Sequence, residues 1–160
     1  MRRAAVVAIL LVLTLGGVAN AAPPVAMVTG TYNYFVNPDN PDTSRAISIS
    51  ARATDPVKGT FTITRSGTTV ITGVFTCLRL AGADAWLAGV GNMTGYSAVF
   101  MWVHDGGTPA ADRDTAFTWF SDPGETLADM EALCESMTTS PYGLDPFPVA
   151  SGNVMVHPAR

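Results

Sequence analysis

Hydrophobic and polar residues alternate along much of this chain, and the alternation is clearest between residues 45 and 54. Successive side chains of a β-strand point to opposite faces, so a period of two predicts a strand with one buried face. The apolar set is Ile47, Ile49, Ala51 and Ala53, and the polar set is Ser48, Ser50, Arg52 and Thr54. We therefore expect a half-buried strand here, which Asp55-Pro56 ends.

Strand composition recurs at short, regular intervals through the rest of the chain. Segments rich in Val, Ile, Thr and aromatic residues, bounded by Gly, Pro, Asn and Asp, predict strands. The expected strands are 29–36, 45–54, 59–65, 68–80, 85–90, 95–104, 115–121 and 149–157. Turn signals separate them, among them the cluster 37–42 and the hairpin dipeptide Ser66-Gly67.

Two of these segments carry more specific expectations. In 68–80 we expect the larger aliphatic residues to share one face, with Gly73 interrupting the strand as a bulge or bend. Those aliphatic residues are Val70, Val74, Leu78 and Leu80. Segment 95–104 is apolar on both faces, which predicts a central strand that is covered on both sides.

The hydrophobic period changes after residue 121. Asp122 is a capping residue, Pro123 suits the first helical position, and Glu125 lies three residues after the cap. Apolar residues then recur at spacings of three and four, at Leu127, Met130, Leu133, Cys134 and Met137. We expect a short amphipathic helix over 123–136, with Cys134 facing the sheet.

Seven to eight short strands and one late helix favour an all-β fold. Regular spacing of short strands is typical of a single antiparallel barrel or sandwich. The length suits one domain, which we place at 22–160.

The first 21 residues resemble a secretory signal peptide. Arg2 and Arg3 precede the apolar run 4–15, and Ala19-Asn20-Ala21 offers small residues at a cleavage site. The run is too short for a permanent membrane span. We expect residues 1–21 to be removed and the mature chain to be secreted into an extracellular setting.

The charge of the mature chain narrows the classes of partner. Without Arg2 and Arg3 the chain keeps seven basic residues against 13 acidic ones, a net charge of −6. Nucleic-acid binding requires a basic stripe, and binding to anionic lipid requires a basic cluster. We expect neither partner, and the remaining candidates are an extracellular protein or a small ligand.

Cys77 and Cys134 are the two cysteines of the chain. In an oxidising compartment such a pair favours a disulfide, worth about 4 kcal/mol for a loop of this length. The alternatives are two buried thiols or a thiol nucleophile, which requires a nearby base. Neither cysteine has a histidine close in sequence.

The second half of the chain resembles a family of small secreted bacterial domains sometimes labelled post-COAP. The ordered matches are 76–80 with 82–86, 103–107, Pro109, Asp114, 115–120, Cys134, and 148–149 with 152–157. The resemblance implies a compact β-barrel-like fold without assigned catalytic residues. Similar chains place cysteines at positions corresponding to Cys77 and Cys134, which also implies their pairing.

The loop 104–114 is the best candidate for a metal site. Asp105, Asp112 and Asp114, with loop carbonyls, could hold Ca²⁺, which takes six to eight oxygen ligands. The alternative is a turn in which these carboxylates accept hydrogen bonds from backbone amides. Zinc is disfavoured, because a catalytic site requires three protein ligands and the chain has only His104 and His157.

Other chemistries find little support. No Gly-x-Ser-x-Gly elbow occurs, and the acidic residues cluster in turns and in the expected helix rather than as a facing pair. Trp86, Trp102 and Trp119 could form a ligand platform, although aromatic residues at strand spacing more often build a core.

We therefore expect a secreted, non-catalytic β domain without a cofactor, acting as a structural or interaction module. The alternative is an extracellular barrel that binds a small ligand or Ca²⁺. An eight-stranded barrel can enclose one small molecule.

Overall fold

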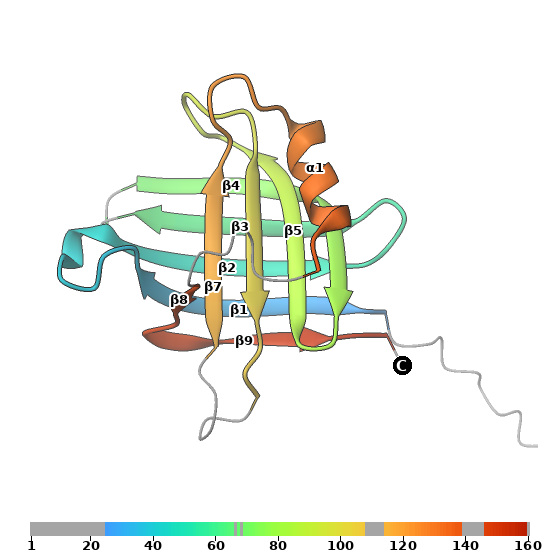
Figure 1. Cartoon of the computed structure of the whole chain (residues 1–160), viewed down its shortest axis with the longest axis horizontal. Helices are drawn as coiled ribbons and strands as arrows, with labels where there is room; N and C mark the ends of the chain where they lie inside the picture. The colour runs from blue at the N-terminus through green and yellow to red at the C-terminus, as the bar shows by residue number, and fades with distance from the viewer. Residues whose placement is uncertain (1–24, 66, 68, 108–113, 139–145, 160) are drawn as a thin grey trace, which may run out of the picture.

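A computed structural model describes residues 25–159, apart from 66, 68, 108–113 and 139–145. Within this part the chain forms nine strands, one α-helix and one short 3₁₀ helix (Figure 1). The strands are β1 Met27–Phe35, β2 Ser44–Arg52, β3 Lys58–Arg65, β4 Thr69–Ala81, β5 Asp84–Gly91, β6 Val99–His104, β7 Thr115–Phe120, β8 Phe147–Pro148 and β9 Ser151–His157. The helices are η1 Pro41–Thr43 and α1 Leu127–Ser136. The expected signal peptide 1–21 lies outside the described residues.

All nine strands belong to one antiparallel sheet in the order β8-β7-β6-β5-β4-β3-β2-β1-β9. The sheet curls into a half-barrel, so that β5, β6 and β7 cross in front of β1, β2, β3 and β9 (Figure 1). The all-β expectation with one short helix is confirmed, with slightly more strands than the seven to eight expected. The additional strand is β8, which is not among the segments predicted to be strands; it contains Pro148, and an end strand tolerates proline.

The sheet bends along β4, which contributes to both crossing layers. Gly73 and Gly91 are directly opposite each other, and the ring of Phe61 lies against both positions. A Cβ atom on Gly73 would lie 2.3 Å from Phe61 Cζ and 2.3 Å from the Val90 carbonyl oxygen. Phe61 is the register partner of Gly73 on the neighbouring β3, so glycine at this position leaves room for the Phe61 ring to lie across β4.

The bulge expected at Gly73 lies a little later, where the register with β5 shifts between Phe75 and Cys77. An additional residue reverses the alternation of faces. Val74 is consequently exposed on the outside, whereas Leu78 and Leu80 pack against the inner core. The expectation that Val74, Leu78 and Leu80 share one face was wrong for this reason; the side chain of Val70 is outside the described set.

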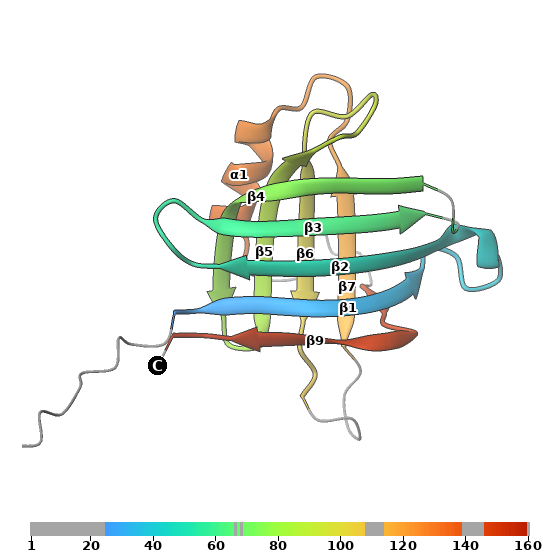
Figure 2. The same ribbon diagram turned by 180° about the vertical axis from the view of Figure 1, so that it is seen from behind.

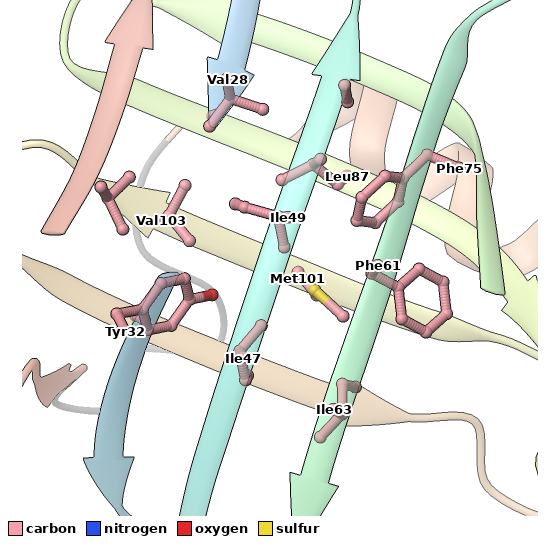
Figure 3. Close-up of a cluster of buried hydrophobic side chains, with 14 of the residues drawn as sticks. Val28, Tyr32, Ile47, Ile49, Phe61, Ile63, Phe75, Leu87, Met101 and Val103 are labelled. Atoms are coloured by element: carbon pink, nitrogen blue, oxygen red, sulfur yellow. The ribbon is translucent and has the colours of Figure 1, made fainter. Parts of the chain in front are cut away.

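The inner core lies between the two layers of the curled sheet. Figure 3 shows side chains from both layers meeting there, including Ile47 and Phe61 from one and Leu87 and Met101 from the other. Tyr32 and Ile63 are each 0% exposed. Side chains from both layers therefore form one buried hydrophobic cluster between them.

A second cluster covers the outer side of β5 and β6. Met130 and Cys134 of α1 are buried there against Trp86, Ala88 and Phe100. The two faces of β6 thus contact the inner core and the helix-covered cluster, which confirms the expected doubly covered strand. The strand is shorter than expected, because 95–98 form a loop in which Gly95 adopts φ +86°.

The helix begins four residues later than expected. Thr126 is its N-cap, and Thr126 and Asp129 form a reciprocal capping box. The expected cap at Asp122 forms a separate turn instead, in which the carboxylate of Glu125 accepts a hydrogen bond from the Asp122 N–H at 2.6 Å. Among the described residues no helix is long and apolar enough to cross a bilayer.

Candidate functional site

Asp105 and Asp114 lie at the two ends of the loop that joins β6 to β7, beside the edge of β9. Asp114 accepts hydrogen bonds from the N–H groups of Val154 at 2.7 Å and Gly106 at 3.1 Å. Asp105 accepts from Val156 at 2.9 Å and Gly107 at 2.9 Å. Each of the four carboxylate oxygens therefore has a backbone donor.

These contacts provide acceptors for N–H groups at an unpaired edge of the sheet. Strand β9 pairs with β1 on one side only, so alternate N–H groups point away from the ladder. Val154 is 0% exposed, and an unpaired buried N–H would cost about 1–3 kcal/mol. The two carboxylates take the place of the missing neighbouring strand.

The segment between β8 and β9 completes the connection between the ends of the sheet. Val149 donates to the Asp114 carbonyl at 2.9 Å, and Ala150 donates to the Asn33 carbonyl at 2.7 Å. Two successive residues of this segment therefore contact opposite ends of the sheet, Val149 next to β7 and Ala150 at β1. Asp114 contributes both its backbone and its side chain to this closure.

The Ca²⁺ expectation involved Asp105, Asp112 and Asp114. The structure brings the first and third to neighbouring amides of β9, and Asp112 is outside the described residues. Among the described residues, no group of three or more His, Cys, Asp or Glu is placed to hold a metal ion. The observed contacts agree with the alternative in which the carboxylates accept backbone hydrogen bonds.

His104 and Asp84 form a pair that the sequence analysis did not anticipate. Asp84 Oδ1 lies 3.0 Å from His104 Nδ1, and both side chains are about one-third exposed. The β5–β6 register places the two residues directly opposite each other. If 85–90 and 95–104 are taken as a hairpin, their ends pair, so the sequence could have indicated this contact. A carboxylate in this position orients an imidazole ring. Thr115 is the register partner of His104 on β7.

The three tryptophans point to the outer side of the sheet rather than into the half-barrel. Trp86 and Trp102 are 1% and 5% exposed and belong to the cluster that α1 covers. Arg79 lies over the Trp86 ring, with Cζ 5.0 Å from its centroid. Trp119 is half-buried, and its indole N–H donates to Glu125 at 3.4 Å. Packing accounts for all three positions.

The expected disulfide is present and buried. Cys77 and Cys134 are joined between β4 and α1, with Cα atoms 6.4 Å apart. Arg79 also donates to the carbonyl of Met137, at the end of the same helix. The helix is therefore tied to the sheet near its C-terminal end by one covalent and one polar contact.

A row of aromatic rings joins the outer cluster to the inner core. Phe147 of β8 stacks on Tyr34 at 5.3 Å and on Phe117 at 6.5 Å, and Tyr34 stacks on Tyr32 at 6.4 Å. Beside this row lies an apolar groove of about 400 Å³. Its lining residues are Phe35, Pro38, Pro146, Phe147, Pro148, Val149 and Ala150.

The buried tyrosines carry the largest electrostatic perturbation of the core. Burial, and secondarily the neighbouring Tyr34, raise the pKa of Tyr32 well above its ordinary value. Burial likewise raises the pKa of Tyr34. The hydroxyl of Tyr32 has no hydrogen-bond partner in the described structure, so its deprotonation inside the core would be unfavourable.

The outer side of β9, β1, β2, β3 and the first half of β4 is open to solvent. Figure 2 looks onto this layer, and α1 lies behind it. We call its outward-pointing residues the outer sheet face. They include Thr29, Thr31, Asn33, Ser48, Ser50, Arg52, Lys58, Thr60, Thr62, Thr64, Thr72, Val74, Asn153, Met155 and His157.

Comparison with family models, with curated proteins and with solved structures finds no match for this chain.

Proposed function

We propose that this chain is a secreted, disulfide-stabilised β domain that acts by binding an extracellular partner rather than by catalysis. The hydrogen bonding of Asp105 and Asp114 is the observation that carries this proposal. The carboxylates that looked most like functional groups in the sequence are occupied by the backbone of β9. The outer sheet face is left as an open surface that could contact a partner.

The disulfide and the absence of a membrane-spanning helix from the described residues are compatible with an extracellular protein. The prediction that the chain is exported depends on the composition of residues 1–21. The test is expression of the full chain in a host with a secretory pathway. The proposal expects a product that starts at Ala22, outside the cytoplasm, and lacks thiols that react with iodoacetamide.

Catalysis is tested on the same material. A screen with ester, peptide and glycoside substrates should give no turnover above the buffer rate. The informative control is the His104→Ala variant, because the His104–Asp84 pair is the one described acid–base arrangement of a suitable kind. Turnover that this variant abolishes would overturn the non-catalytic proposal.

The second candidate, a barrel that binds a small ligand or Ca²⁺, remains a prediction from the sequence. Its test is a thermal melt of the mature chain in Ca²⁺ and in chelator. A higher melting temperature in Ca²⁺ that the Asp105→Asn variant removes would establish the cation site. Equal melting temperatures would favour the purely structural role of the carboxylates.

A further inference from the structure

The outer sheet face is an ordered grid of hydroxyl and amide side chains. The strand register aligns one row of five residues and a second row beside it. The first row is Asn153, Thr31, Ser48, Thr62 and Thr72, and the second is Met155, Thr29, Ser50, Thr60 and Val74. Neighbours within a row are about 4.8 Å apart, and rows are about 6.8 Å apart.

A third row adds positive charge at one margin of this grid. His157, Met27, Arg52 and Lys58 are successive register partners across β9, β1, β2 and β3. Arg52 and Lys58 are exposed and directly opposite each other, a like-charge arrangement that disfavours the strand pairing. No ion pair involving either side chain occurs in the described structure. The same strands carry a second like-charge pair, Arg45 opposite Arg65, at positions on the inward face; Arg52 and Lys58 are the pair on the outer sheet face.

Charge is strongly segregated in the molecule. Strands β1, β2, β3, β4 and β9 contain five basic residues and no Asp or Glu. The basic residues are Arg45, Arg52, Lys58, Arg65 and Arg79. In contrast, residues 122–135, which include most of α1, contain five of the 13 acidic residues and no Lys or Arg. Asp55 lies in the turn between β2 and β3, and Asp105 contacts Val156, next to His157 at the other end of this row.

The exposed Arg52 and Lys58 favour an anionic partner, and the side chains around them favour one class of anion over others. Single-stranded nucleic acid requires several aromatic platforms, and the two polar rows contain no aromatic side chain. A lipid surface requires an apolar patch or a dense basic cluster, and here the exposed large apolar residues are Val74 and Met155. An extended sugar polymer matches a grid of hydroxyls, and its carboxylates match two adjacent cations.

We propose that the outer sheet face binds an extended, carboxylate-bearing polysaccharide. The Ser, Thr and Asn side chains of the two polar rows hydrogen-bond the sugar hydroxyls, and Arg52 and Lys58 pair with the carboxylates. This inference rests on the proposed function, since it names the partner class of a secreted binding domain. Because the face is open, affinity comes from several weak contacts along the polymer rather than from one enclosed site.

The experiment uses the oxidised mature chain and affinity electrophoresis in gels that contain polygalacturonate, neutral dextran or no polymer. Parallel binding assays use single-stranded DNA and vesicles of anionic lipid. The proposal expects retardation by polygalacturonate alone, and weaker retardation as the salt concentration rises. Binding to DNA or to vesicles without binding to polygalacturonate would overturn it, as would no binding at all.

Variants locate the surface. Arg52→Gln with Lys58→Gln should weaken binding at least tenfold, and Thr62→Val with Ser48→Ala should weaken it several-fold. Arg45→Gln with Arg65→Gln is the matched control: it removes two positive charges from the opposite ends of β2 and β3, at positions on the same face as the inward-pointing Ile47 and Ile63, and should leave binding unchanged. Melting curves confirm that each variant is folded. Equal loss in the control would place the ligand elsewhere.

The failure of this inference is distinguishable from failure of the proposed function. Reducing ends are measured after incubation with polygalacturonate. Binding without cleavage supports both proposals, whereas binding with cleavage keeps the ligand class and overturns the non-catalytic role. If export is observed and no polymer binds, the ligand class is wrong and the secreted domain stands.

Discussion

The carboxylate of Asp114 accepts a hydrogen bond from the N–H of Val154, 2.7 Å away and 40 residues later in the chain. The contact joins the beginning of β7 to the outward edge of β9. Together with the corresponding contact from Asp105 to Val156, it completes the hydrogen bonding of an end strand without another strand. The polar residues of the β6–β7 loop therefore belong to the architecture of the curled sheet.

Asp114→Ala should be strongly destabilising, because Asp114 is a buried loop residue. It leaves the buried Val154 N–H and the Gly106 N–H without an acceptor, so we expect a loss of about 2–4 kcal/mol in the free energy of unfolding. Urea denaturation measures it. Asp39→Ala, at an exposed position in the 37–42 turn, is the control and should change stability by about 0.5 kcal/mol or less. Equal effects of the two substitutions would contradict the structural role of Asp114.

Local patterns predicted much of this fold, and long-range contacts account for what they missed. The period of two in β2 and β3 was read correctly because both faces of these strands have a constant environment. In β4 the same argument failed between Val74 and Leu78, because a bulge depends on how β5 pairs rather than on β4 alone.

The same distinction applies to the candidate site. Asp105 and Asp114 were recognisable as loop carboxylates, but their partners Val154 and Val156 come from a strand that follows the helix. Backbone donors carry no sequence signature. The disulfide was easier to predict from the sequence, since two cysteines in an expected oxidising compartment allow a single pairing.

Removing the disulfide should lower stability without changing the strand content. The double substitution Cys77→Ala with Cys134→Ala is expected to cost about 4 kcal/mol, because the closed loop spans 57 positions. Urea denaturation with and without reductant measures the effect. The reductant should destabilise the unmodified chain and leave the double variant unaffected. A reductant effect of similar size on both chains would contradict this assignment.

The entry into β9 depends on Gly152. It has φ +95°, and a Cβ atom there would lie 2.1 Å from the Thr31 carbonyl oxygen. Gly67 also has a positive φ, of +70°, but a Cβ atom there would meet nothing within 4 Å. We expect Gly67→Ala to cost about 1 kcal/mol of backbone strain and Gly152→Ala to cost at least about 2 kcal/mol more. Thermal or urea unfolding compares them. Equal costs would show that the approach of β9 to β1 is not as close as described.

Tyr32→Phe should improve stability at alkaline pH. The folded pKa of Tyr32 is raised above that of the unfolded chain, about 10, so its contribution is complete below pH 10 and is lost as pH rises through the folded value. Phenylalanine removes this loss. At pH 7 the substitution should be neutral or slightly stabilising, because the hydroxyl has no partner in the described structure.

The measurement is the unfolding midpoint from pH 7 to 12, with the exposed Tyr96→Phe as control. The decline above pH 10 should be shallower in Tyr32→Phe than in the control. A loss of more than about 1 kcal/mol at pH 7 would mean that the Tyr32 hydroxyl has a partner in solution.

Amide hydrogen exchange of Val154 and Val156 tests most directly whether side-chain carboxylates complete the edge of β9. In the unmodified chain both amides should be protected to an extent similar to the paired amides of β1. In Asp114→Ala the protection of Val154 should fall, while Val156, which donates to Asp105, should retain most of its protection. Rapid exchange of both amides in the unmodified chain, or unchanged protection of Val154 in the variant, would contradict this account.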